Sequence, residues 1–184
     1  MPVASTRDRA LDAALELLGD GGIRALTHAR VDERAGLPKG STSNWFRTRE
    51  ALVAGVVAWL SERERAEFDA APRPVIETPD DLVDAFTELI AVQSGPLATR
   101  TRARYSLFLE GARSPELLAP LIVQRTIFVE WSTALLARIG APDPAGAVHS
   151  VMAALDGLLL HRVTVDPDAE SRPVVERAVR AALL

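Results

Sequence analysis

Apolar residues recur at helical spacing along almost the whole chain, and no segment shows the sustained period-two alternation typical of a half-buried strand. The first apolar stripe follows a capping residue at Ser5 or Thr6 and is closed by the glycines of residues 19–22. Its members are Ala10, Leu11, Ala14, Leu15 and Leu18. The pattern predicts an all-α protein that opens with a helix.

Proline and glycine divide the rest of the chain into further helices. A long helix is predicted from Thr48 to about Ala70, and the proline-rich residues 71–79 follow it as a linker. The later helices are expected at about 80–94, 97–112, 115–139, 144–164 and 170–183. Their breaks fall at Gly95-Pro96, Ser114-Pro115, 140–144 and Asp166-Pro167.

Two short helices around a tight turn are predicted between residues 27 and 46. Thr27 caps the first, Gly36 ends it, and Pro38 fits the first turn of the second. The second helix must be short, because residues 40–44 (Gly-Ser-Thr-Ser-Asn) are all poor helix formers. The small core that fixes the angle between the two helices is expected to contain Val31, Ala35, Leu37, Trp45 and Phe46.

The composition of the second short helix is hard to explain by stability. Each Ser, Thr or Asn costs roughly 0.5 kcal/mol relative to alanine in a helix. Short hydroxyl and amide side chains allow a backbone to approach a DNA groove and bond to phosphate oxygens or base edges. Lys39, the only lysine of the chain, lies beside them. The alternative is that residues 36–44 form an ordinary surface turn.

Residues 6–60 resemble the N-terminal domain of TetR-family transcriptional regulators in the order and spacing of several motifs. These are Thr6–Leu18, Gly22, Thr27, Glu33–Leu37, Lys39-Gly40, Trp45-Phe46 and Arg49–Leu52. The resemblance implies a three-helix helix-turn-helix DNA-binding domain over 1–49 and a helical ligand-binding and dimerisation domain over 50–184. It also implies a repressor that a small-molecule effector releases from double-stranded DNA. The expected state is a homodimer, joined through the last two long helices (about 144–164 and 170–183) and bound to a palindromic operator.

The same resemblance assigns residues to DNA contact. They are Thr27, His28, Arg30, Lys39, Ser41, Thr42, Ser43, Asn44, Trp45, Arg47 and Arg49. Thr42, Ser43 and Asn44 are expected to face the groove, and Lys39 and Ser41 to contact phosphate or base at the start of the recognition helix. The flanking DNA backbone is expected to be contacted by Thr27, His28, Arg30, Arg47 and Arg49. For His28, a role as a polar partner at the start of its helix competes with base recognition. The family often has an apolar residue at position 42 and a tyrosine at 43, so Thr42 and Ser43 indicate a subgroup with its own operator.

Aromatic side chains on two later helices suggest where an effector binds. The candidate residues are Phe86, Arg104, Tyr105, Phe108, Phe128, Trp131, Met152 and Asp156. Such stripes also form plain core, and both interpretations remain open. Asp156 lies in an apolar stretch seven residues after His149, where it either flanks a pocket, pairs with an arginine or faces the dimer seam.

Arg100, Arg102 and Arg104 crowd the start of a helix, where the macrodipole disfavours cations. Glu62, Glu64 and Glu67 of the long helix are the expected counter-charges, which would couple the body to the DNA-binding head. An anionic ligand is the alternative.

Composition and charge narrow the function further. The chain has no cysteine, three histidines and no metal-ligand motif, so we expect no enzyme, no metal and no cofactor. No signal peptide or membrane span is visible, which predicts a cytoplasmic protein of a bacterium.

The charges are distributed unevenly along the chain. Residues 1–49 carry eight basic and six acidic residues, whereas the other 135 residues carry thirteen basic and nineteen acidic residues. A slightly basic head on an acidic body fits DNA contact at one end. The alternative is a helical interaction adaptor or small-molecule-binding protein without DNA binding.

Overall fold

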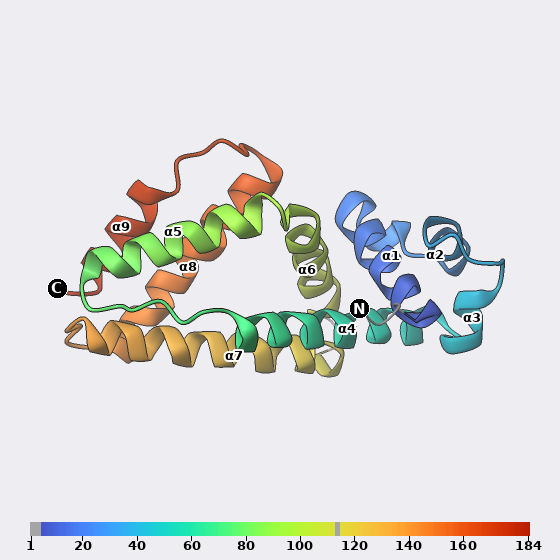
Figure 1. Ribbon diagram of the computed structural model, residues 1–184, viewed down its shortest axis with the longest axis horizontal. Coiled ribbons are helices and arrows are strands. Elements are labelled where there is room, and N and C mark those ends of the chain that lie inside the picture. Colours follow the sequence, from blue (N-terminus) through green and yellow to red (C-terminus); the bar gives the residue numbers. More distant parts are fainter. Residues whose placement is uncertain (1–4, 113–114) are drawn as a thin grey trace. The chain divides into compact units, whose positions relative to one another are not determined.

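The computed structural model describes residues 5–112 and 115–184, and every regular element in these residues is a helix (Figure 1). The elements are α1 (Thr6–Gly21), η1 (Ile23–Ala25), α2 (His28–Arg34), α3 (Ser41–Trp45), α4 (Arg49–Ala70), α5 (Pro79–Ser94), α6 (Ala98–Gly111), α7 (Pro115–Arg138), α8 (Pro144–Thr164) and α9 (Arg172–Ala181). The predicted all-α fold is confirmed. The short 3-10 helix η1 was not predicted. The predicted break at Ser114 lies outside the described residues.

Most helix ends agree with the prediction because local capping residues set them. The side chain of Ser5 accepts a hydrogen bond from the Asp8 backbone N–H, and the Asp8 carboxylate accepts one from the Ser5 backbone N–H. Thr78 and Asp81 form the same reciprocal pair at the start of α5. Each cap satisfies backbone N–H groups that have no partner within the helix.

The described residues form two compact units. One contains residues of 1–70 and 99–124, and the other consists of residues 71–98 and 125–184, so the division falls within α7. The first unit therefore keeps α4 and part of α6 and α7 with the N-terminal helices. The predicted functional boundary after residue 49 stays a prediction.

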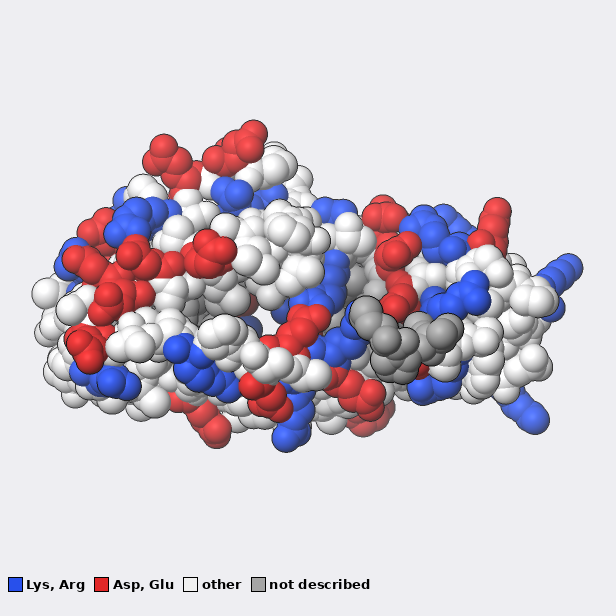
Figure 2. All heavy atoms as spheres, viewed as in Figure 1, with Lys and Arg blue, Asp and Glu red and all other residues white. Residues whose placement is uncertain are grey.

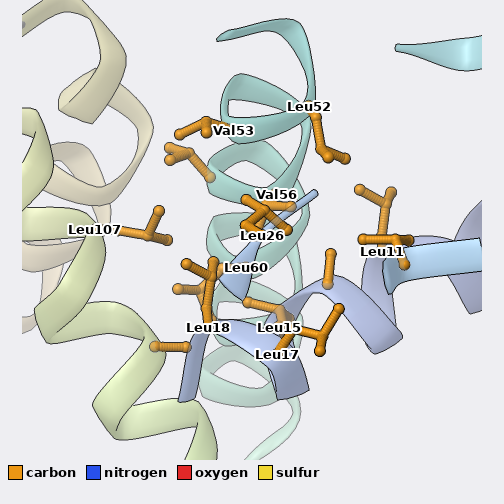
Figure 3. Close-up of a cluster of buried hydrophobic side chains, with 14 of the residues drawn as sticks. Leu11, Leu15, Leu17, Leu18, Leu26, Leu52, Val53, Val56, Leu60 and Leu107 are labelled. Carbon is orange, nitrogen blue, oxygen red and sulfur yellow. The ribbon is translucent and has the colours of Figure 1, made fainter. Parts of the chain in front are cut away.

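The core of the first unit is formed by leucines and valines from α1, α4 and α6. Leu11 and Leu18 of α1, Leu52 and Leu60 of α4, and Leu107 of α6 have no exposed surface (Figure 3). Burial of each such side chain contributes roughly 1.5–3 kcal/mol before the entropy of ordering is subtracted. The short helices α2 and α3 thus rest on a core that continues into α4 and α6.

The second unit packs α5, α8 and α9 around its own apolar core. Leu82 and Ile90 of α5 are fully buried, as are Val151 of α8 and Val175 and Val179 of α9. Two ion pairs join the exposed sides of α5 and α9, one between Arg172 and Asp84 and one between Arg180 and Asp80. Among the described residues, no helix has the length and apolarity to cross a bilayer.

Candidate nucleic-acid interface

The turn before α3 differs from the prediction at Pro38. Gly36 ends α2 as predicted, but Pro38 and Lys39 precede α3, whose first residue is Ser41. The prediction that Pro38 occupies the first turn of the helix is therefore wrong, and so is the placement of Lys39 at the helix start. The physical reason is Gly40, whose φ of 90° lies in the left-handed region and cannot belong to an α-helix. Pro38 instead accepts hydrogen bonds from the backbone N–H and the hydroxyl of Ser41, at 3.1 and 2.6 Å.

The start of α3 is held by Asp32 of α2, a residue absent from the predicted site. One oxygen of its carboxylate, Oδ2, accepts from the Gly40 N–H at 2.7 Å. The other, Oδ1, accepts from the Thr42 N–H at 2.8 Å and from the Thr42 hydroxyl at 2.6 Å. Asp32 is 3% exposed, and α3 has no side-chain cap of its own. Helical spacing could have revealed it, because Asp32 lies three residues before Ala35, one of the positions predicted to face inward.

The surroundings of Asp32 favour its charged form. Burial raises the pKa of the carboxyl, but the hydrogen bonds from the Thr42 hydroxyl and the N–H groups of Thr42 and Gly40 outweigh this. The net effect holds the pKa of Asp32 below its usual range. Asp32 is therefore a carboxylate at neutral pH.

Thr42 and Trp45 are placed opposite to their predicted roles. The prediction that Thr42 faces the groove is wrong, because its side chain has no exposed surface and bonds to Asp32. The prediction that Trp45 belongs to the small core is also wrong, since it is 39% exposed. Thr42 and Phe46 are four residues apart and both turn inward. Ser43, Asn44 and Trp45 consequently form the exposed side of α3.

The residues predicted to flank the groove lie on α2, in the turn and at the start of α4. Thr27 accepts from the Arg30 N–H at 3.4 Å, and Nε2 of His28 donates to the Phe46 carbonyl at 2.6 Å. Arg49 donates to the Ile23 carbonyl at 2.9 Å. The contact of His28 agrees with its role as a polar partner. Their DNA contacts stay predictions, together with those of Ser41, Ser43, Asn44 and Trp45.

Positive side chains surround the exposed side of α3. Arg30, Lys39 and Arg47 are all exposed. Figure 2 shows Lys and Arg side chains projecting from the surface over α2 and α3. Exposed cations beside small polar side chains are what the phosphates and base edges of DNA require.

Family models match both parts of the chain. Residues 10–56 match the model for bacterial regulatory proteins of the tetR family. Residues 77–184 match the model for the tetracyclin repressor-like C-terminal domain. The chain belongs to the TetR family of transcriptional regulators. It is a DNA-binding regulator, and members of its family bind operators and small-molecule effectors and are dimers.

One curated protein and several solved structures are similar to most of the chain. The HTH-type transcriptional regulator BetI of Rhizobium meliloti (strain 1021) is 26% identical over 158 residues, which cover 85% of this chain and 77% of that protein. A transcriptional regulator from Rhodococcus sp. Rha1 matches in structure with a TM-score of 0.78, 19% identity and coverage of 97% and 94%. The multidrug binding protein EbrR complexed with ethidium matches with a TM-score of 0.69, 25% identity and coverage of 98% and 99%.

The predicted effector residues of this TetR-family chain divide between the two units. In the second unit, the ring centroid of Phe86 lies 6.5 Å from that of Phe128 and 6.4 Å from that of Trp131. The ring centroids of Phe128 and Trp131 are 5.5 Å apart. Phe86 and Met152 are buried. We call Phe86, Phe128 and Trp131 the aromatic cluster. Whether it lines an open pocket stays a prediction.

The remaining effector candidates have polar or core contacts elsewhere. Arg104 pairs with Glu64 at 2.9 Å and lies 6.0 Å from the ring centroid of Tyr105, while Phe108 packs against the core of the first unit. Asp156 accepts two hydrogen bonds from Arg125, at 3.3 and 2.6 Å. Of the alternatives for Asp156, pairing with an arginine is the one observed.

Proposed function

We propose that the protein is a homodimeric repressor that reads a palindromic operator with two copies of α3 and is released by a small aromatic effector. The observation that carries this proposal is the exposed side of α3, which consists of Ser43, Asn44 and Trp45. Ser43 and Asn44 reach base edges in the major groove, and Trp45 contacts the sugar–phosphate backbone beside them. Lys39 and Arg47 bind the flanking phosphates.

A narrow stripe on α8 supports the proposed dimer. Ser150, Ala153 and Gly157 are exposed at a spacing of three and four residues, and Leu160, one turn further, is 46% exposed. Small residues at this spacing allow two helices to pack closely. Two copies of α8, with α9 beside them, would bring the heads into two-fold symmetry. The half-sites would then lie one DNA turn or a near multiple apart, centre to centre.

Release of DNA requires a connection from the body to the head, and α6 supplies it within the first unit. Arg100 donates two hydrogen bonds of 2.6 Å to Glu67, and Arg104 pairs with Glu64 at 2.9 Å. These two predicted counter-charges are confirmed, whereas Arg102 donates to the Gly19 carbonyl of α1 at 2.8 Å. The hydrogen bond from Arg100 also lowers the pKa of Glu67 against the opposing effect of burial.

The close approach of α1 and α6 strengthens this connection. A Cβ atom at position 19 would lie 2.1 Å from the carbonyl oxygen of Thr99, so only glycine fits there. Any shift of α6 is therefore passed to α1 and α4. An effector that binds only the shifted conformer releases DNA by population shift.

The effector is an aromatic cation in this proposal. EbrR has been solved with ethidium, proflavin and malachite green, which are all aromatic cations. The aromatic cluster offers stacking and cation–π surfaces for such a molecule. The unit that contains it carries seven basic and twelve acidic residues, which favours a positive ligand. A regulator of this kind acts in the bacterial cytoplasm, where the chromosome is.

An electrophoretic mobility shift with the DNA upstream of its own gene tests the DNA-binding function. The control is a duplex of the same length and composition with scrambled sequence. We expect specific binding at nanomolar to low micromolar dimer that weakens with added salt. Equal binding of both duplexes throughout this range would contradict the proposal.

Malachite green added to the protein without DNA tests the effector class. We expect quenching of tryptophan emission that is lost in Trp131→Phe. Unchanged quenching in that variant would remove the aromatic cluster from the effector site.

A further inference from the structure

We propose that His28 and Asp32 of α2 position the recognition helix α3 for operator selection, and we call this pair the α2 clamp. The inference rests on the proposed function, because it assigns a role to residues that do not themselves meet DNA. Both side chains bond to α3 or its flanking residues. The clamp would set the direction in which Ser43, Asn44 and Trp45 point.

The two clamp residues hold opposite ends of α3. His28 and Asp32 are four residues apart and so lie on one side of α2. Asp32 bonds to Gly40 and Thr42 at the start, within 2.6–2.8 Å. His28 donates to the Phe46 carbonyl just past the end, at 2.6 Å. Two attachment points fix the rotation of a short helix as well as its distance from α2.

Besides the two bonds from Ser41 to the Pro38 carbonyl, α3 has few contacts that hold its start. It comprises five residues, it lacks a side-chain cap of its own, and it begins after a glycine in the left-handed region. The first N–H groups of any helix have no partner within it. Asp32 supplies the missing acceptor from a neighbouring helix, for Gly40 and Thr42. Thr42 is the only buried residue of α3, so its start is held by polar contacts and not by apolar packing.

The strength of these contacts suits a positioning role. Hydrogen bonds to a carboxylate are about twice as strong as neutral ones. A buried carboxylate also fixes geometry, because any rotation of α3 that breaks one bond leaves a buried charge without its partner. Base recognition by bidentate contacts is sensitive to such rotations. Operator selection is therefore expected to depend on the clamp more strongly than general DNA affinity does.

The test compares four variants of the full-length protein. Asp32→Asn keeps the shape but replaces one acceptor oxygen by an NH₂ group, which then faces the N–H of Gly40 or the donors of Thr42. Thr42→Val keeps the shape and removes one of the three bonds to Asp32. Thr42→Ser keeps all of them, and Glu33→Gln removes a neighbouring exposed carboxylate on α2. The last two are the matched controls.

The probe is the duplex that the wild-type protein selects from a random-sequence pool, with a scrambled duplex beside it. The readout is the ratio of the two affinities, after active protein has been counted by stoichiometric titration. We expect Asp32→Asn to lower this ratio on the order of 100-fold and Thr42→Val to lower it about tenfold. Decreases of this size correspond to the loss of one or two base contacts. Binding to the scrambled duplex should stay within about threefold in all four variants, since phosphate contacts dominate it.

A merely structural role would give a different result. Loss of folded protein lowers only the active fraction, which the titration counts, and leaves the ratio of the two affinities unchanged; that result would overturn the proposal. An unchanged ratio in Asp32→Asn would also overturn it. If Asp32→Asn does not fold, the comparison of Thr42→Val with Thr42→Ser decides by the same ratio.

Fluorine NMR of 5-fluorotryptophan protein tests the positioning without DNA. We expect Asp32→Asn to shift the resonance of Trp45, assigned with Trp45→Phe, and to leave those of Trp59 and Trp131 in place. An unmoved Trp45 resonance would contradict the clamp. Failure of the wild-type protein to select any duplex would contradict the proposed function instead, and the NMR result would still decide on the clamp.

Discussion

Gly19→Ala is the sharpest perturbation that the structure offers, because it acts at the close approach of α1 and α6. The added Cβ would lie 2.1 Å from the Thr99 carbonyl oxygen and 2.5 Å from the Thr99 Cγ2 atom. The nearest atom belongs to the backbone of α6 and cannot swing aside. The two helices must therefore separate before the methyl group fits.

Two opposing contributions determine how Gly19→Ala changes the free energy of unfolding. Alanine in place of glycine inside a helix stabilises by about 0.8–1 kcal/mol. Overpacking of a buried contact costs typically about 1–3 kcal/mol, and a backbone neighbour favours the upper part of that range. We expect a net loss of about 1–2 kcal/mol in the free energy of unfolding. Separation should also break the bond from Arg102 to the Gly19 carbonyl.

Urea denaturation followed by tryptophan fluorescence measures this change. The control is the double variant Gly19→Ala with Thr99→Ala, which removes Cγ2 but keeps the carbonyl oxygen. We expect the double variant to regain little of the lost free energy of unfolding, because the contact with the Thr99 carbonyl oxygen remains. If Gly19→Ala instead stabilises the protein by about 1 kcal/mol, as at an open helical position, α1 and α6 do not pack this closely in solution.

Three further predictions address the DNA contacts, the dimer and the buried carboxylate. Lys39→Ala should weaken all DNA sequences alike and reduce the slope of log affinity against log salt by about one; relaxed preference at a single base pair would show that Lys39 reads a base. Gly157→Leu should weaken self-association in sedimentation equilibrium, because no atom of the described residues outside the neighbouring residues and backbone of α8 lies within 4 Å of the added Cβ, so that a partner helix would meet it; unchanged self-association would place the dimer seam elsewhere. The lowered pKa of Asp32 makes its contribution to stability complete above the unfolded-state pKa of about 3.9 and lost as pH falls through the lower folded-state value. The difference in unfolding free energy between wild type and Asp32→Asn should accordingly shrink below about pH 4, and a constant difference would refute the pairing.

The helices that could be predicted from the sequence are those whose ends are set locally. Ser5 with Asp8, and Thr78 with Asp81, are capping boxes within four residues of chain. The pairing of Arg100 and Arg104 with glutamates of α4 was predictable for a similar reason. Cations at a helix start need a counter-charge, and α4 offers glutamates at the spacing of its turns.

The register of α3 could not be predicted in the same way. Pro38 is a good first residue for a helix, and local preference therefore put the start of α3 too early. The actual start depends on Asp32, a residue of another helix that bonds across the turn. An error of three residues at the start changes which side chains face inward. The predicted groove-facing role of Thr42 and the predicted core role of Trp45 are both wrong, while the predicted DNA contact of Trp45 stays a prediction.

Polar contacts join neighbouring helices at two places in the first unit, between α2 and α3 and between α4 and α6. Apolar packing tolerates small rotations, whereas a buried charge with fixed partners does not. Between α2 and α3 that property favours one orientation of the side chains that we propose to read bases. Between α4 and α6, the carboxylate of the Arg100–Glu67 pair is less buried, since the Glu67 side chain is 51% exposed against 3% for Asp32 as a residue. Ion pairs that are open to solvent contribute less to stability. The clamp is thus suited to specificity, and the Arg100–Glu67 pair is the α4–α6 contact better suited to the proposed shift.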